Sequence, residues 1–417
     1  MADSGELAAV SALAQEQEVI GVKMKRDGGE TTISEQREKK RKCSEDDADG
    51  YRAHKTARGD EHGTVVAQHY NMQKEIGLEA RSQSRIFYLR NFNNWIKSVL
   101  INEFLDQVRR GRVGQNQPLR VLDLGCGKGG DLLKWRKGGI AHLVCADMAR
   151  TAVDQCQQRY MDMKNRGGRL FTAEFICADC SKSDLRGKFQ KPDEAFDLCS
   201  CQFAFHYAME SRAQVEMMLH NACAHLRRGG FFFGTTSDAR ELMRRHQMAN
   251  VCAREENDGR AAKHENEGTT PNKGFGNEVY HVRFHDTGTS PPPIFGAKYD
   301  FHLEGVVDCP EFLVHFPLLE CMAQKLGMKL VMKKTFSELF HEFVKKDNGR
   351  HLLSVMQALE TYPASNGSQL VSADEMEYKH VADFLQNSSN PNDSVGTMSK
   401  SEWEAAGMYL AFAFTKQ

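Results

Sequence analysis

The sequence lacks any apolar run long enough to cross a membrane, and its first residues do not show the pattern of a secretory signal peptide. It also lacks an excess of charge of either sign, since 55 Lys and Arg stand against 56 Asp and Glu and leave a net charge of −1. We therefore expect no membrane partner, and any contact with nucleic acid has to come from local basic patches. The 417 residues are enough for one large domain with additional segments.

The twelve cysteines lack the regular spacing of a disulfide-stapled secreted domain. They indicate a reducing, intracellular setting in which thiols serve as small core residues. The pairs Cys177/Cys180 and Cys199/Cys201 together have the four ligands that a structural zinc needs. We expect these pairs at the ends of the third and fourth strands, which are not neighbours in a doubly wound sheet, and so predict no metal site.

The first 62 residues are predicted to form a disordered, charged tail, because Tyr51 is their only aromatic residue and charged and small polar residues dominate. Two basic clusters, residues 23–26 and 37–42, stand in this tail. They predict localisation in the nucleus through a nuclear import receptor. A weak RNA contact, or simply a solvated basic tail, is the alternative.

A short apolar run, residues 121–124, breaks into glycines and is followed by amphipathic sequence, the pattern of a strand, a tight turn and a helix. The glycines are Gly125, Gly127, Gly129 and Gly130. The first, second and fourth fit the dinucleotide fingerprint, whereas the first three fit the loop of enzymes that use S-adenosylmethionine (SAM). Asp123 favours SAM, because an acid there suits a cationic amino acid and would repel a pyrophosphate. An ordinary strand-to-helix turn is the remaining interpretation.

After the glycine loop, apolar and amphipathic stretches alternate, which predicts a mostly parallel sheet covered by helices on both faces. The expected strands are 143–147, 175–179, 196–202 and 231–236, and the expected helices are 151–166 and 213–226, the latter ended by Gly229-Gly230. In such folds ligands bind at the carboxyl ends of the strands, where Asp147, Asp179 and Gln202 stand. Asp147 follows the glycines by about twenty residues, as a carboxylate that meets ribose hydroxyls does. Asp179 suits the adenine amino group of SAM, with a turn or helix cap as its alternative role.

Before the glycine loop, apolar residues recur at helical spacing over residues 82–110. Asn93 and Lys97 are four positions apart and so share one face of this helix. That face is either an exposed polar surface or part of a lid over the cofactor.

Beyond the fifth strand, residues 250–274 are polar and glycine-rich and are predicted to form a mobile surface insertion. Residues 277–284 and 299–303 alternate with a period of two and are expected to join the sheet as antiparallel strands. The remaining expected elements are helices near 311–326 and 350–360, a strand near 328–334, a polar, turn-rich segment at 361–399, and a closing strand at 409–415 with Tyr409 on the face opposite Leu410, Phe412 and Phe414.

Five motifs stand in this frame: IFYLRNFNNWIK at 86–97, LDLGCGKGGD at 122–131, CQFAFHY at 201–207, FGNE at 275–278 and FLVHFP at 312–317. Taken together they resemble the motifs of the eukaryotic mRNA cap guanine-N7 methyltransferases. The resemblance runs from about residue 84 to the C-terminus and implies a catalytic domain, which we place at 63–417. The fold it implies is α/β, a Rossmann-like class I SAM-dependent methyltransferase with a mostly parallel central sheet and added antiparallel strands.

The resemblance also implies the roles of individual residues. SAM is expected to be bound by Lys97, Gly125, Asp147, Asp179, Gln202 and Tyr207, to which the glycine loop adds Asp123 and Gly127. The cap guanosine is expected to contact Asn93, Asn94, His206, Glu278 and Tyr409, with Lys128, Lys134 and Arg159 nearby. The partners implied are 5′-capped pre-mRNA and a small activating RNA-binding subunit, for which segment 361–399 is a candidate docking region. The transcription machinery is a further candidate partner.

The reaction that the resemblance implies makes modest chemical demands. Guanine N7 has an in-plane lone pair and no proton, so it needs no general base to attack a methyl sulfonium. The protein has to align donor and acceptor and stabilise the positive charge on the purine, which we assign to Glu278, His206 and Tyr207. Tyr409 suits packing on a cationic ring, and the three basic residues near the cap suit its triphosphate.

Three other functions stay open. The chain is alternatively a SAM methyltransferase with a different acceptor, a catalytically silent RNA-binding scaffold, or a nicotinamide oxidoreductase. Basic residues around the expected pocket argue against a different acceptor. The intact acids Asp123, Asp147 and Asp179 argue against a fold that has lost its cofactor.

Overall fold

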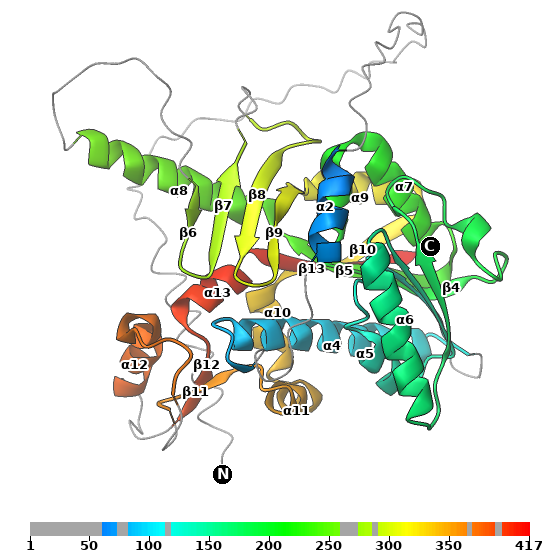
Figure 1. The fold of residues 1–417 in the computed structure, drawn as a ribbon, viewed down its shortest axis with the longest axis horizontal. Coiled ribbons are helices and arrows are strands. Elements are labelled where there is room, and N and C mark those ends of the chain that lie inside the picture. The colour runs from blue at the N-terminus through cyan, green and yellow to red at the C-terminus, as the bar shows by residue number, and fades with distance from the viewer. Residues whose placement is uncertain are drawn as a thin grey trace, which may run out of the picture.

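A computed structural model of the protein describes residues 61–72, 82–112, 118–258, 274–285, 291–364, 369–387 and 394–417. The two basic clusters of the predicted tail lie outside these described residues, and so does most of the predicted insertion, 259–273. The described chain is built around a twisted central sheet, with a second sheet and a small lobe at one end of it (Figure 1). Among the described helices, none has the length and apolar character needed to cross a membrane.

The central sheet has seven strands in the order β10-β13-β5-β4-β1-β2-β3. Its parallel strands are β1 (Arg120–Leu124), β2 (His142–Asp147), β3 (Thr172–Cys177), β4 (Phe196–Gln202) and β5 (Leu226–Ser237). At one edge, β13 (Tyr409–Lys416) runs antiparallel to both β5 and β10 (Met328–Thr335). The predicted class of fold, a mostly parallel sheet with added antiparallel strands, is confirmed. Two strands separate β3 from β4, as expected for the two cysteine pairs.

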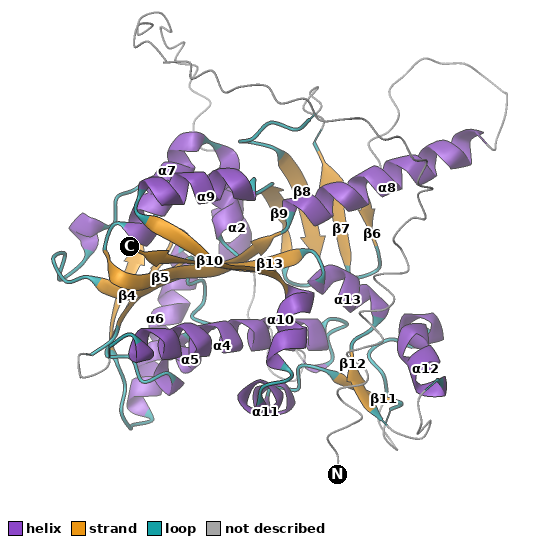
Figure 2. Ribbon diagram, turned by 180° about the vertical axis from the view of Figure 1, so that it is seen from behind, coloured by secondary structure: helices purple, strands orange, loops and turns teal. Residues whose placement is uncertain are grey.

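Helices cover both faces of this sheet (Figure 2). One face carries α4 (Phe87–Arg110), α5 (Leu132–Lys137), α6 (Arg150–Asn165) and α10 (Phe336–Phe343), and the other carries α7 (Arg212–Cys223) and α9 (Phe316–Lys325). The closing strand β13 contributes side chains to the hydrophobic cores on both faces of the sheet, because successive side chains of a strand point to opposite faces. Tyr409 belongs to the first core, whereas Leu410, Phe412 and Phe414 belong to the second, as predicted.

The strands predicted at 277–284 and 299–303 exist, but the prediction that they join the central sheet was wrong. They belong to a separate antiparallel sheet of β6 (Phe275–Gly276), β7 (Tyr280–Phe284), β8 (Lys298–Leu303) and β9 (Val307–Phe312) (Figure 1). This sheet turns apolar side chains toward α8 (Ala239–Asp258), where His246 packs on Phe284 with ring centroids 4.6 Å apart. Alternation reports a buried face but not the partner strand, and β10 and β13 already occupy the edge beyond β5.

Three boundaries differ from the predictions. Residues 250–258, placed in a surface insertion, continue α8. The glycines at 229–230 lie inside β5 rather than at a helix end. In the strand, a Cβ on Gly230 would lie 2.8 Å from the carbonyl oxygen of Asp197 on β4. The helix expected near 311–326 begins only at Phe316, because β9 extends to Phe312 and the His315 side chain caps the helix.

The segment 361–399, predicted to be polar and turn-rich, is more ordered than that. It holds η3 (Glu375–Tyr378), α12 (Lys379–Gln386) and a small sheet of β11 (Glu360–Tyr362) and β12 (Val395–Thr397), which we call the lobe. A core of Tyr378, Val381, Leu385 and Val395 holds it together. Next to the lobe are α11 (Asp347–Val355), where a helix was expected near 350–360, and α13 (Lys400–Ala406). The other short elements are α2 (Glu61–Met72), η1 (Arg186–Lys188) and η2 (Phe205–Glu210).

Candidate active site

The glycine loop between β1 and α5 is the centre of the candidate site. Gly125 and Gly127 have φ angles of +68° and +51°, a conformation that residues with a Cβ rarely adopt. A Cβ at Gly125 would lie 2.5 Å from the Cβ of Ala204, just after β4, whereas a Cβ at Gly127 would meet nothing within 4 Å. The loop therefore packs against the end of β4 on one side and leaves open space at Gly127, as a cradle for a ligand does.

Asp147, at the end of β2, lies beside this open space. Its carboxylate accepts hydrogen bonds from the backbone N–H of Gly127 at 2.9 Å and of Ala149 at 2.8 Å. Burial raises the pKa of Asp147, and these two hydrogen bonds oppose the shift. The structure thus places the predicted acid of β2 against the predicted glycine of the loop.

A second buried cluster lies at the start of α5. Asp131 pairs with Lys97 of α4 at 2.9 Å and with Lys134 at 2.7 Å. Burial would raise the pKa of Asp131, but the two ammonium groups hold it well below its ordinary value. Nearby, burial and the Asp131 charge raise the pKa of Asp123, which accepts a hydrogen bond from Trp135 Nε1 at 3.3 Å. Lys97 is therefore fixed beside the loop, and the lid role of α4 stays a prediction.

Asp179 and Gln202 mark the ends of two further strands. Asp179 follows β3 and accepts hydrogen bonds from the backbone N–H of Ser181 at 2.9 Å and from its hydroxyl at 2.7 Å. This is the turn-capping role that we gave as the alternative to adenine binding, and the two roles do not exclude each other because a carboxylate accepts several bonds. Gln202 is held in place by Ser200 and Thr235 at 3.1 and 3.2 Å.

The turn η2 carries His206 and Tyr207 toward the second sheet. His206 is 2% exposed, and its Nε2 lies 3.3 Å from a carboxylate oxygen of Glu311 on β9. Glu311 also accepts a hydrogen bond from the Tyr299 hydroxyl at 2.7 Å. Among the described residues, neither ring nitrogen of His206 has a well-aligned hydrogen-bond partner. A buried ring with unsatisfied nitrogens is suited to receiving a polar ligand.

The helix α2 packs over this part of the site, beside α6 and β9. The hydroxyl of Tyr70 lies 3.0 Å from that of Tyr207, and the ring of His62 lies edge-on to Phe312 at 4.5 Å. The sequence pattern places residues 1–62 in a disordered tail and offers residues 82–110 as either an exposed polar surface or a lid, so it misses α2 as a covering element. Its signal is weak but present, since His62, Val66 and Tyr70 recur every four residues and so lie on one helical face.

Acidification should loosen α2. Burial lowers the pKa of His62 from 6.5 to about 4, so the undocked helix takes up a proton before the docked one does. Docking is then fully stabilised above pH 6.5 and weakens as the pH falls toward 4. We expect amide hydrogen exchange in α2, corrected for its intrinsic pH dependence, to speed up over this window in the wild type but not in His62→Phe. Equal acceleration in both proteins would contradict this role of His62.

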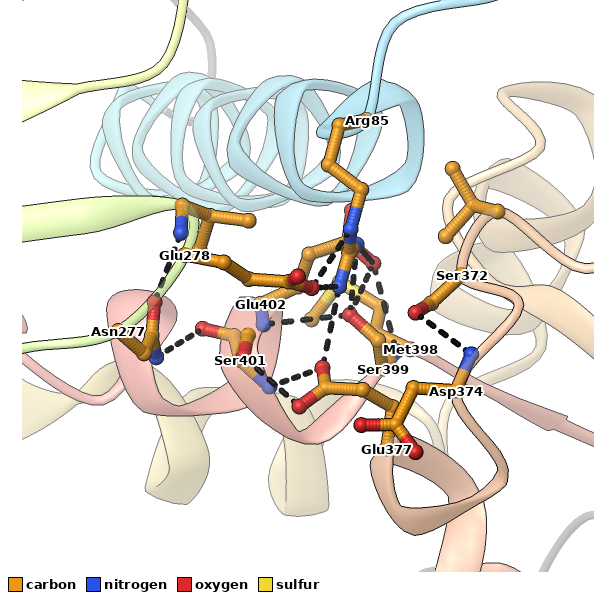
Figure 3. Close-up of polar contacts among 12 residues, drawn as sticks. Arg85, Asn277, Glu278, Ser372, Asp374, Glu377, Met398, Ser399, Ser401 and Glu402 are labelled. Carbon is orange, nitrogen blue, oxygen red and sulfur yellow. Dashed lines mark hydrogen bonds and ion pairs between the residues drawn. The ribbon is translucent and has the colours of Figure 1, made fainter.

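The residues predicted to contact the cap lie on several separate elements, and His206 on η2 has been described above. Asn94 accepts a hydrogen bond from Lys134 at 3.2 Å, so both belong to the Asp131 cluster, and a contact of Lys134 with the cap stays a prediction. Tyr409 is buried and stacks on Phe336 at 5.5 Å. Glu278 precedes β7, is half exposed, and pairs with Arg85 (Figure 3). The others are Asn93 on α4, Lys128 in the glycine loop and Arg159 on the exposed side of α6.

Two groups of described side chains bring three possible metal ligands within 4.8 Å of one another. They are Cys126, Cys145 and Cys156, and Asp184, His220 and His225. Neither includes the C-x-x-C pair or Cys199 and Cys201, and a structural zinc takes four ligands. Cys126 belongs to the glycine loop, and its thiol and that of Cys145 interact with the thiol of Cys156, which lowers the pKa of Cys156 to about 5.

The strand order, the glycine loop after β1 and the polar groups at the ends of β1 to β4 define a Rossmann-like class I SAM-dependent methyltransferase. Residues 53–417 match the model of the mRNA (guanine-N(7))-methyltransferase domain. The chain belongs to the mRNA cap guanine-N7 methyltransferase family. The match begins ten residues before the domain boundary that we placed at residue 63.

Individual relatives agree with the family match. The chain is 47% identical over 357 residues to the mRNA cap guanine-N(7) methyltransferase of Drosophila melanogaster, covering 84% of this chain and 77% of that protein. It is 39% identical over 360 residues to the enzyme of the same name from Caenorhabditis elegans, covering 84% and 86%. With mRNA cap guanine-N(7) methyltransferase 1 of Arabidopsis thaliana the identity is 34% over 363 residues, covering 84% and 81%.

Proposed function

We propose that this chain transfers the methyl group of SAM to N7 of the 5′ guanosine cap of mRNA, converting GpppN to m7GpppN by direct in-line transfer without a general base. The family match over residues 53–417 carries this function. Two of the open alternatives, a nicotinamide oxidoreductase and a methyltransferase with another acceptor, do not fit that match. The roles of individual residues are inferred from the geometry.

The described residues fit SAM, whose sulfonium supplies the methyl group. The open space at Gly127 and the buried Asp147 carboxylate beside it suit a nucleoside, with the ribose hydroxyls donating to Asp147. Asp179 and Gln202 lie at the ends of the neighbouring strands and are assigned to the base and the amino acid end. Lys97, anchored by Asp131, and Tyr207 close the site from α4 and η2.

The acceptor side is assigned to residues of η2, the second sheet and β13. Glu278 offers a carboxylate for the guanine and for the positive charge that develops on it. The buried His206 has nitrogens for polar contacts with the base. Tyr207, held by Tyr70 and packed on His206 at 4.3 Å, and Tyr409 offer ring faces that bind a cationic methylated base better than a neutral one. Lys128 and Arg159 are assigned to the triphosphate.

The test uses methyl-labelled SAM and RNA that ends in unmethylated GpppG or GpppA, followed by digestion to locate the label. We expect the label on guanine N7, with rates reduced about a hundredfold or more in Asp147→Ala and Glu278→Ala, since each removes a group that positions a reactant. SAM binding by the wild type without any cap labelling would mean either another acceptor or a reaction that requires the activating subunit. No SAM binding at all would favour the scaffold.

The partners beyond capped mRNA are part of the same proposal. We place the protein in the nucleus, where a receptor that binds the basic clusters imports it. A small activating RNA-binding subunit docks on the lobe. The transcription machinery is a further partner. Met376 of η3 is 63% exposed on the lobe, so a substitution there would disturb such a contact without disturbing the core of the lobe. Activation unchanged by Met376→Lys would argue against this surface. Unchanged nuclear accumulation after neutralising both basic clusters would argue against the import signal.

A further inference from the structure

Arg85, just before α4, contacts three other segments through one guanidinium group (Figure 3). Its Nε donates to Glu278 Oε1 at 2.9 Å, and its Nη2 donates to the same oxygen. Its Nη1 donates to the hydroxyl of Ser399 at 3.0 Å, and its Nη2 donates to Glu377 of the lobe at 3.1 Å. The carboxylate of Glu402, on α13, lies 3.8 Å from Nη1.

The partners on the lobe and α13 are themselves fixed. Glu377 accepts hydrogen bonds from the backbone N–H and the hydroxyl of Ser401, each at 2.9 Å. Glu402 is fully buried and accepts from the backbone N–H of Leu89 at 3.0 Å and from the hydroxyl of Ser399 at 2.9 Å. Arg85 is thus held by a rigid frame on one side of its guanidinium.

Glu278 is held differently. Its neighbour Asn277 ties the backbone to α13 by donating to Glu404 at 2.8 Å. The carboxylate itself is 51% exposed, and among the described residues Arg85 is the side chain bonded to it. Both bonds fall on Oε1, so Oε2 is left for a donor from a ligand. The direction of this carboxylate depends on Arg85.

The charges in this cluster also make the direction of Glu278 depend on Arg85. One guanidinium faces the carboxylates of Glu278, Glu377 and Glu402, and a planar fork orients carboxylates as well as neutralising them. Burial raises the pKa of Glu402 to about 7, which reduces the negative charge that competes for Arg85. Without Arg85, Glu278 would have its two acidic neighbours and no cation from this cluster.

We propose that Arg85 is a positioning residue for the cap carboxylate: it holds Glu278 toward the substrate and ties its direction to the lobe and α13. The inference rests on the proposed role of Glu278 in binding the cap guanosine. It assigns Arg85 no contact with the substrate. It also means that a displacement of η3, which carries Glu377, would change the direction of the Glu278 carboxylate through Arg85.

The experiment measures steady-state methylation of GpppG-ended RNA by the full-length chain, with RNA and SAM titrated separately. Arg85→Ala is expected to raise KM for the RNA about tenfold, the size of effect that misplacing one charged contact has, while the Kd for SAM stays unchanged. Arg85→Lys keeps the charge but not the fork and should restore part of the loss. Glu377→Gln should raise the same KM by a smaller factor.

The control is Arg283→Ala. It removes an exposed arginine on β7 that pairs with Asp300 on β8 at 2.8 Å, in the second sheet. It should leave both KM values unchanged. In a double-mutant cycle, Arg85→Ala combined with Glu278→Gln should be no worse for KM than Glu278→Gln alone, because both act through one carboxylate.

The outcomes separate this inference from the role of Glu278. If Glu278→Gln raises KM for the RNA and the Arg85 and Glu377 variants do not, the positioning role is overturned. Additive effects of Arg85→Ala and Glu278→Gln would overturn it as well. If Glu278→Gln itself leaves KM and kcat unchanged, the proposed cap role of Glu278 fails, and the positioning role fails with it.

Discussion

Asp131→Asn is expected to destabilise the protein by about 3 kcal/mol, because it leaves the buried ammonium groups of Lys97 and Lys134 without their carboxylate. The same change should weaken SAM binding, since Lys97 loses the anchor that holds it beside the glycine loop. Urea unfolding measures the first effect, and calorimetric titration with SAM measures the second. Adding Lys134→Met removes one of the stranded charges and should restore part of the stability without restoring SAM affinity.

The pH dependence of this loss has a definite sign. Lys97 and Lys134 overcome the effect of burial and hold the pKa of Asp131 below its ordinary value of 3.8, so the carboxylate stabilises the fold above that pH. The difference between wild type and variant should therefore be constant above about pH 5 and shrink as the pH falls through 4. A difference that grows on acidification would show that Asp131 is not the stabilising partner.

A matched control exists on the same helix as Lys97. Asp106 pairs with Arg109 at 3.6 Å on the exposed face of α4, where both side chains are about half exposed. Asp106→Asn should change stability by less than about 0.5 kcal/mol, because exposed ion pairs contribute little. Equal losses from Asp106→Asn and Asp131→Asn would mean that burial of the Asp131 cluster is not the cause.

The parts of the fold that could be predicted are those whose signal is local. The glycine loop, the helix α4 and the alternation of β13 each follow from neighbouring residues, and the structure confirms them. The second sheet was assigned to the wrong place because alternation does not identify a partner strand. The lobe was underestimated because its core joins Tyr378 to Val395, with mostly polar sequence between them.

The candidate site shows the same division. Asp147 could be placed from its distance to the glycines, and Gly127 now proves to be its hydrogen-bond partner. Asp131, Glu311 and Arg85 could not be found, because each depends on at least one partner that is far away in the chain, such as Lys97 for Asp131. Arg85 and Glu278, for example, are 193 positions apart, and only the folded chain brings them together.

Gly125→Ala should mainly lower the stability of the fold, whereas Gly127→Ala should mainly weaken SAM binding. At Gly125 the added methyl would meet Ala204 at 2.5 Å in a backbone with φ of +68°, which should cost about 3 kcal/mol of stability from overpacking and strain. At Gly127 the methyl meets nothing within 4 Å, so the loss is limited to the strain of φ at +51°, about 1 kcal/mol. The same methyl occupies the open space of the cradle and should weaken SAM binding about 10–100-fold, the range that one misplaced methyl group costs.

The two glycines can be told apart by a second substitution. Ala204→Gly removes the atom that Gly125→Ala would strike, so the pair should regain the overpacking part of the lost stability but not the part due to φ. It should do nothing for Gly127→Ala, whose defect is in the ligand space. Urea unfolding and SAM titration on the four variants measure both quantities. If Gly127→Ala kept wild-type SAM affinity, the cofactor would not lie against this loop, and the assignment of Asp147 to the ribose would fall as well.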